Sequence, residues 1–137
     1  MVKMNMVYRG ELRCVATHGP SGTTIETDAP VDNHGKGERF SPTDLVATAL
    51  GTCVLTTIAI RTRKLGLALE GTTCTVTKEM VATPVRRIGR LATEVRVPVP
   101  TTPEQRRLIE EIAHGCPVHK SLHPDVQAPI TFQWAEG

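Results

Sequence analysis

The sequence is poor in aromatic residues and has no excess of charge of either sign. Its 137 residues include one Trp, one Tyr and two Phe, too few to build a platform on which nucleic-acid bases stack. Lys plus Arg number 16 and Asp plus Glu number 14, which gives a formal charge of +2. A charge this balanced argues against a nucleic-acid surface and against a polybasic membrane anchor. We therefore expect no nucleic-acid partner.

Long apolar segments are also missing. The longest uncharged stretch, residues 45–60, contains Thr, Gly and Cys and is shorter than the ~20 apolar residues of a membrane-spanning helix. It predicts a buried helix and no membrane partner. Residues 1–10 show no apolar segment followed by a small-residue cleavage site, so we expect a cytoplasmic protein. In that reducing compartment the four cysteines are buried thiols, metal ligands or redox groups rather than structural disulfides.

Motifs for metals and phosphates are weak or lacking. No CxxC pair occurs, and no glycine-rich loop follows an expected strand as a phosphate loop would. Residues 114–123 contain one Cys and three His, the residue types that zinc prefers. Zinc sites normally have four ligands in tetrahedral geometry. A zinc site here would need Cys53 or His18, from another part of the chain, as a further ligand, and we expect no zinc site. A Cys–His hydrolase would need a distant His oriented onto Cys53, and any of the five His could serve.

What is present is the pattern of one globular domain over residues 1–137. A chain of this length with 39% hydrophobic residues buries enough surface to fold without disulfide or metal. The elements do not alternate strictly between strand and helix, which favours an α+β fold over a doubly wound sheet. Apolar periodicity predicts strands over residues 6–16, 23–28, 72–82, 87–99 and 126–134, and helices over residues 42–65 and 103–114.

Both helices carry recognisable start signals. Ser41 is an N-cap, Pro42 occupies the first helical position, and Asp44 lies in the first turn, where the helix dipole favours an acid. The second helix follows a capping box from Thr102 to Gln105. Apolar residues of the first helix point in several directions, so we expect it to be enclosed on most sides.

The four cysteines differ in their expected surroundings. Cys14 and Cys74 lie on the apolar faces of expected strands, where a thiol packs as a small hydrophobe. Cys53 lies in the middle of the first helix, where burial alone would raise its pKa. Cys116 follows a helix stop at Gly115 and precedes Pro, so it is expected at an N-cap, where free backbone N–H groups favour a thiolate. Position alone therefore favours Cys116 as the more reactive thiol.

Two motifs taken together resemble a known family. Residues 41–53 read SPTDLVATALGTC, with Pro at the helix start ahead of a mid-helix Cys, and residues 116–122 read CPVHKSL, with a second Cys before Pro. They resemble the OsmC/Ohr family of osmotically inducible and organic-hydroperoxide-resistance proteins. The resemblance covers nearly the whole chain and implies an α+β fold with antiparallel sheets around a long, buried, Cys-bearing helix. It also implies an intertwined homodimer with two sites at the subunit interface, without metal or organic cofactor.

The resemblance further implies reduction of organic hydroperoxides by two thiols. Cys53 would be the peroxidatic nucleophile and Cys116 the resolving thiol, the reverse of the order that position alone favours. Peroxide reduction requires a thiolate to attack the O–O bond and a second thiol to condense with the resulting sulfenic acid. A dithiol reductant then restores the two thiols.

The sequence departs from the best-studied branch of that family at two points. That branch has Glu after the helix-start Pro, whereas this chain has Thr43, and Asp44 is the nearest carboxylate. That branch places an Arg in the N-terminal turn, but residues 18–22 read HGPSG. Arg39, close to Glu38, is the substitute that we expect to stabilise the thiolate. A solvated loop Arg is the alternative interpretation.

The resemblance therefore implies a thiol peroxidase with a small hydroperoxide as substrate and a dithiol as reductant, acting as a homodimer in the cytoplasm. The alternative is an OsmC-fold redox-sensing or ligand-binding protein that keeps the two thiols without efficient turnover. Peroxide consumption that is driven by a dithiol and lost on Cys53→Ser would separate the two.

Overall fold

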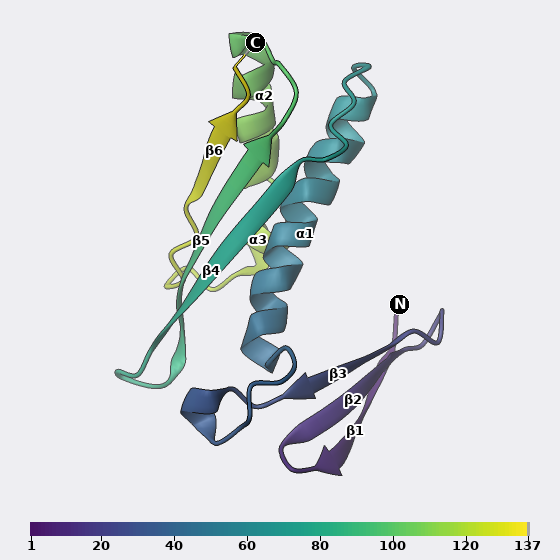
Figure 1. Ribbon diagram of the computed structural model, residues 1–137, viewed down its shortest axis with the longest axis vertical. Helices are drawn as coiled ribbons and strands as arrows, with labels where there is room; N and C mark the ends of the chain where they lie inside the picture. Colours follow the sequence, from purple (N-terminus) through teal and green to yellow (C-terminus); the bar gives the residue numbers. More distant parts are fainter. Residues whose placement is uncertain (137) are drawn as a thin grey trace. The chain divides into compact units, whose positions relative to one another are not determined.

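The computed structural model describes residues 1–136 (Figure 1). The chain divides into two compact units, Met1–Val46 and Ala47–Gly137. Each unit contains one three-stranded sheet. The α+β class is confirmed, and the single domain over residues 1–137 stays a prediction.

The first unit contains an antiparallel sheet in the order β1-β2-β3. The strand predicted over residues 23–28 is confirmed as β3. The polar segment after it contains a short 3-10 helix that the sequence pattern did not predict. The elements are β1 (Met4–Gly10), β2 (Arg13–His18), β3 (Thr24–Asp28) and the 3-10 helix η1 (Val31–Asn33).

Strands β1 and β2 form a hairpin where the sequence predicted one strand over residues 6–16. The turn between them places Glu11 and Leu12 at positive φ angles of 53° and 63°. The prediction was wrong because the turn preserves the alternation of apolar and polar residues. Tyr8 pairs with Cys14 across the two strands, and paired residues share a face of the sheet. The same apolar face therefore continues through the turn.

The first unit has almost no core of its own. Met6 and Tyr8 on one face of β1 are 65% and 63% exposed. A small sheet with an uncovered apolar face is only marginally stable in water. The side chains that the structure buries in this unit are all polar: Thr27, Asp28 and Ser41.

The second unit contains a mixed sheet in the order β4-β5-β6. Strands β4 and β5, which correspond to the strands predicted over residues 72–82 and 87–99, form an antiparallel hairpin, whereas β6 runs parallel to β5. Parallel neighbours require a crossover, and the helices α2 and α3 provide it (Figure 1). The elements are β4 (Thr73–Val81), β5 (Arg87–Val97), α2 (Pro103–His114), α3 (Pro117–Ser121) and β6 (Ile130–Trp134).

Helix α1 (Pro42–Arg63) begins as the sequence predicts. The Asp44 N–H donates to Ser41 Oγ at 3.1 Å, and the Ser41 N–H donates to Asp44 Oδ2 at 2.9 Å. This reciprocal cap satisfies two backbone donors at the helix start. The helix ends shortly before the predicted Leu65, and Gly66 follows with a φ of 73°.

One stripe of α1 packs against β4. Gly51 permits the close approach, since a Cβ there would lie 3.0 Å from Val76 Cγ2 and 3.4 Å from Cys74 Sγ. The helix was expected to be enclosed on most sides, but a three-stranded sheet covers only one of them, and Ile60 remains 48% exposed. The buried residues of the stripe are Ala47, Leu50, Gly51, Val54, Ile58 and Thr62.

Helix α1 is longer than the apolar segment that the sequence indicated. It has 22 residues, and its most apolar window has a mean hydropathy of 1.6. By length and composition the helix is long enough to cross a membrane. The expectation of a segment too short to do so was wrong, because the helix extends beyond residues 45–60 at both ends. Core helices of soluble proteins meet the same criterion, which therefore does not discriminate between the two settings.

The core of the second unit contains one hydroxyl group without a partner. Thr93 lies between Leu91 and Val95 on the buried face of β5 and is 2% exposed. Within residues 1–136 its Oγ1 has no hydrogen-bond partner. An unsatisfied buried hydroxyl destabilises the folded state.

We expect Thr93→Val to raise the free energy of unfolding by about 1 kcal/mol, because valine has the same shape and no polar atom to desolvate. Urea unfolding followed by circular dichroism measures the change. Thr77→Val on the exposed face of β4 is the matched control. A loss of stability at Thr93 with none at Thr77 would show that the hydroxyl is satisfied.

Candidate active site

Cys116 lies where the chain turns from α2 into α3. It is fully buried at 0% exposure and has an extended backbone, with φ −65° and ψ 140°. Its Sγ accepts a hydrogen bond from the His119 N–H at 3.3 Å. The N-cap position predicted for Cys116 is confirmed, and Pro117 occupies the first helical position, where a missing N–H costs nothing.

Cys53 meets this turn from α1. Its side chain is partly exposed, and its Sγ lies 3.8 Å from Thr57 Oγ1, one helical turn along α1. The Val118 N–H and the thiol of Cys116 also donate hydrogen bonds to Cys53 Sγ. The structure thus brings the two cysteines of the sequence motifs into direct contact.

The two thiols have pKa values shifted in opposite directions. Burial is the largest influence on the pKa of the Cys53 thiol and raises it. Hydrogen bonds from the Val118 N–H, the Cys116 thiol and the Thr57 hydroxyl lower it, and the net pKa of Cys53 lies below its ordinary value. Of the two thiols, Cys53 is therefore the one that loses its proton more readily.

The pKa of Cys116 rises although it is an N-cap. Burial is the largest influence and raises it, the neighbouring Cys53 raises it further, and the N–H donors of His119 and Val118 only partly oppose this. The raised pKa of Cys116 is the opposite of the shift that its N-cap position predicted. The sequence analysis did not identify Val118 or Thr57. Thr57 could have been found from its spacing of one helical turn from Cys53, whereas Val118 contacts Cys53 only through tertiary packing.

We expect Cys53 to be alkylated faster than Cys74 at neutral pH. Burial raises the pKa of the Cys74 thiol, whereas the lowered pKa of Cys53 increases its thiolate fraction, and the thiolate is the nucleophile. Half-maximal alkylation of Cys53 should come at lower pH than in the unfolded chain, and that of Cys74 at higher pH. Iodoacetamide labelling across pH with peptide mass spectrometry measures both, and the urea-unfolded chain is the control. Earlier labelling of Cys74 would contradict the assignment.

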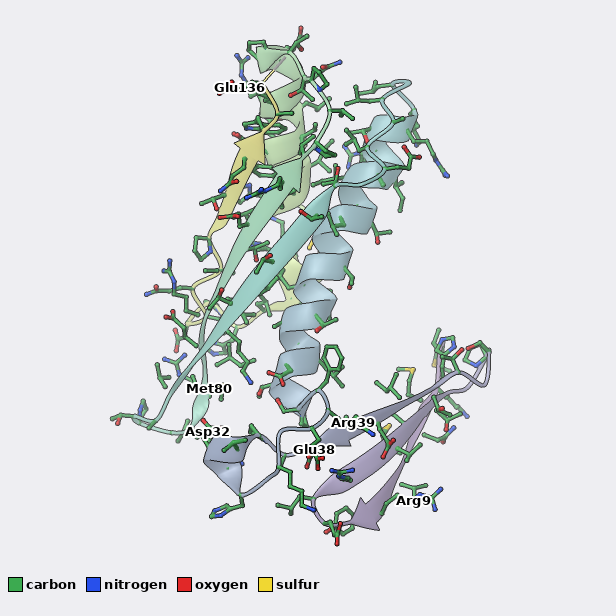
Figure 2. The ribbon with its side chains drawn as sticks, viewed as in Figure 1. Arg9, Asp32, Glu38, Arg39, Met80 and Glu136 are labelled. Atoms are coloured by element: carbon green, nitrogen blue, oxygen red, sulfur yellow. The ribbon has the colours of Figure 1, made fainter. Side chains whose placement is uncertain are left out.

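Arg39 and Asp44, the predicted supports of the thiolate, have other partners in the first unit. Arg39 Nε lies 3.8 Å from Glu26 Oε2, and both side chains are about half exposed. Figure 2 labels Arg39 beside Glu38 on the segment that leads into α1, and Arg39 donates to the Glu38 carbonyl at 2.9 Å. The Glu38 carboxylate instead binds Arg13, a residue that the sequence did not single out. Asp44 acts in the cap of α1.

The histidines near Cys116 bind backbone carbonyls. Nδ1 of His114 donates to the Glu110 carbonyl at 2.8 Å, and Nε2 of His119 donates to the Ala128 carbonyl at 3.1 Å. Within residues 1–136, no group of three or more His, Cys, Asp or Glu side chains is placed to hold a metal. Across the same residues, the hydrogen-bond partners of Cys53 Sγ include no imidazole that would act as the base of a Cys–His hydrolase.

Comparison with known proteins places this site in a family. Residues 35–130 match the family of OsmC-like proteins. A crystal structure from Psychrobacter arcticus 273-4, named for osmotic stress induction and a detoxification response, is 41% identical, with 97% of this chain and 96% of that chain covered and a TM-score of 0.92. Among curated proteins no significant match was found.

More distant structures share the fold. An OsmC-like protein from Mycoplasma pneumoniae is 14% identical, with 99% of this chain and 98% of that chain covered and a TM-score of 0.84. An organic hydroperoxide resistance protein from Legionella pneumophila is 16% identical, with 97% and 96% covered and a TM-score of 0.79. The sequence match and the 41% identical structure show that the chain belongs to the OsmC-like protein family.

Proposed function

We propose that the protein is a thiol peroxidase that reduces organic hydroperoxides, with Cys53 as the peroxidatic thiol and Cys116 as the resolving thiol. The observation that carries the proposal is the contact between the two thiols, in which the pKa of Cys53 is lowered and that of Cys116 is raised. A peroxidatic thiol needs to be a thiolate, and a resolving thiol needs to lie within reach of it. The Legionella pneumophila relative of the same fold is named an organic hydroperoxide resistance protein.

The chemistry proceeds in three steps. The Cys53 thiolate attacks the O–O bond of the hydroperoxide, forms a sulfenic acid and releases an alkoxide that takes a proton to become the alcohol. The Cys116 thiol then attacks the Cys53 sulfur, which forms a disulfide and releases water. A dithiol reductant exchanges with that disulfide and returns both thiols, becoming a disulfide itself. All four cysteines are free in the structure, and the cycle fits the reducing cytoplasm that we propose as its compartment.

Arg39, backed by Asp44, is the cation that we propose to assist the Cys53 thiolate. If it does, Arg39→Ala should raise the pKa of Cys53 and slow its alkylation at neutral pH, because a nearby positive charge favours the thiolate. Lys36→Ala, on the same loop, is the control. Unchanged alkylation across pH in Arg39→Ala would assign the role to another group, with Arg86, Arg87 and Arg90 next to be tested.

A redox-sensing or ligand-binding role without efficient turnover is the second candidate. The observation that favours it is the set of groups acting on Cys53. Among residues 47–136 these are hydrogen-bond donors rather than cations, so the thiolate has less stabilisation than a charged partner would supply. Such a protein would form the disulfide once and be reduced slowly.

We also propose that the protein is a homodimer. Only 28% of the apolar window of α1 is buried within the chain, and one face of β1 leaves Met6 and Tyr8 exposed. Exposed apolar surface of this extent marks a protein interface. A second copy of the chain is the partner that the family resemblance implies.

The decisive experiment mixes the reduced protein with cumene or tert-butyl hydroperoxide. With dithiothreitol in excess, the peroxidase consumes many equivalents of hydroperoxide per chain, whereas a sensor consumes about one. Peptide mapping after one equivalent should find a disulfide between Cys53 and Cys116, with Cys14 and Cys74 reduced, because a sulfenic acid condenses with the thiol in contact with it. First oxidation at Cys116, or a dominant pairing with Cys14 or Cys74, would overturn the assigned roles.

A further inference from the structure

His119 connects the turn that carries the thiol pair to the sheet. Its backbone N–H donates to Cys116 Sγ at 3.3 Å, and its ring Nε2 lies 3.1 Å from the carbonyl oxygen of Ala128. Since a carbonyl only accepts, Nε2 carries the hydrogen. Imidazolium has a hydrogen on both nitrogens, so this bond survives protonation of the ring.

Ala128 belongs to a rigid segment. The Gln127 N–H donates to the Gly89 carbonyl at 3.0 Å, the Leu91 N–H donates to the Gln127 carbonyl at 2.7 Å, and the Thr93 N–H donates to the Pro129 carbonyl at 2.9 Å. The residues on both sides of Ala128 are thus bonded to β5. The His119 ring is therefore fastened to the edge of the sheet.

Helix α3 is too short to hold its orientation by itself. It has five residues and contributes no buried side chain, and helices this short are unstable by themselves. The ring of His114 meets that of His119 edge-on, with centroids 5.9 Å apart, but His114 Nδ1 bonds to its own helix at Glu110. The hydrogen bond from His119 to Ala128 is a side-chain link from α3 to the segment that is bonded to β5.

The first turn of α3 supplies the donors of the site. Pro117 has no N–H, the Val118 N–H reaches the thiols, and the His119 N–H reaches Cys116 Sγ. The Lys120 N–H donates to the Cys116 carbonyl at 3.1 Å. Whatever fixes the orientation of this turn therefore fixes both N–H donors relative to the two sulfur atoms.

We propose that His119 is a positioning residue for the thiol pair, whose ring anchors α3 to Ala128 and so holds the Val118 N–H on Cys53 Sγ. The inference rests on the proposed function in taking Cys53 as the reacting thiol. His119 touches neither substrate nor Cys53 in this role. The titratable groups facing it are the His114 ring and the Cys116 thiol.

The test compares substitutions that keep or remove the ring donor. His119→Gln places an amide N–H near the position of Nε2 and should keep the anchor, whereas His119→Asn is too short to reach Ala128 and His119→Leu has no donor. His123→Leu on the exposed segment after α3 is the matched control. All variants carry Cys14→Ser and Cys74→Ser, so that alkylation and oxidation report Cys53 and Cys116 only.

The readouts are the pH profile of Cys53 alkylation and the rate of disulfide closure by diamide, which takes up the two electrons and two protons released. His119→Leu and His119→Asn should shift the Cys53 profile to higher pH and slow alkylation at neutral pH by about tenfold for each unit by which the pKa of Cys53 rises. His119→Gln should stay within about twofold of the parent, since it restores the bond. If His119→Leu does not fold, His119→Asn decides the matter.

An unchanged Cys53 alkylation profile in His119→Asn overturns the inference. A His119→Gln variant that is as impaired as His119→Asn also overturns it, because the ring would then act by packing and not by its hydrogen bond. Neither iodoacetamide nor diamide involves a hydroperoxide. A protein that reduces no hydroperoxide yet shows the shifted profile loses the proposed function and keeps the inference. A protein that turns over hydroperoxide, but whose Cys53 profile is unshifted in His119→Asn, keeps the proposed function and loses the inference.

Discussion

Cys53→Ser should lower hydroperoxide consumption by roughly 100-fold or more, because a serine hydroxyl is not ionised at neutral pH and cannot replace a thiolate as nucleophile. The measurement is the initial rate of cumene hydroperoxide loss with dithiothreitol in excess. No disulfide should appear in peptide maps of this variant. Cys74→Ser is the matched control, since it removes a thiol of the same unit whose pKa is raised by burial, and it should retain the parent rate.

Cys116→Ser should behave differently from Cys53→Ser. Its Cys53 thiolate still attacks the first equivalent of hydroperoxide, but no neighbouring thiol condenses with the sulfenic acid. That acid should persist long enough to be trapped by dimedone, or be oxidised further to sulfinic acid by excess peroxide. Equal loss of the first equivalent in both variants would show that Cys116 is not simply a resolving thiol.

The second large effect that we expect concerns dimerisation. The uncovered apolar surface predicts that the chain folds and dimerises together. We expect the protein to sediment at twice the mass of one 14.9 kDa chain and to unfold, rather than release a folded monomer, on dilution. Met6→Lys should shift this equilibrium strongly, by about 3 kcal/mol or more, since it removes apolar contact and buries an unpaired charge.

Asn5→Lys supplies the matched control for Met6→Lys. The two residues are adjacent on β1 and therefore lie on opposite faces of the sheet. Analytical ultracentrifugation and thermal unfolding at several protein concentrations measure both variants. Equal effects at the two positions, or a folded monomer persisting at micromolar concentration, would contradict the dimer.

The sequence predicted most accurately the features that depend on neighbouring residues. The caps of α1 and α2 were identified from Ser41 and Thr102, and the N-cap at Cys116 from the Gly before it and the Pro after it. In each case the chemistry that starts the helix lies within three or four residues of the chain. The family motifs around Cys53 and Cys116 were visible for the same reason.

Features that depend on distant residues were not predictable in this way. The lowered pKa of Cys53 depends on hydrogen bonds from the Val118 N–H and the Cys116 thiol, which reach it only through folding. The ion pair of Arg39 with Glu26 joins a loop to a strand, so it could not be predicted from the residues next to Arg39. The turn at Glu11 and Leu12 escaped notice because it changes the direction of the chain without changing the apolar face.

The hydrogen bond from the His119 N–H to Cys116 Sγ gives α3 a cap that depends on the oxidation state. A thiol sulfur accepts this bond freely, whereas a sulfur drawn into a disulfide with Cys53 must turn toward its new covalent partner. In the proposed cycle, closing the disulfide would therefore weaken the cap at the start of α3, and reduction by the dithiol would restore it.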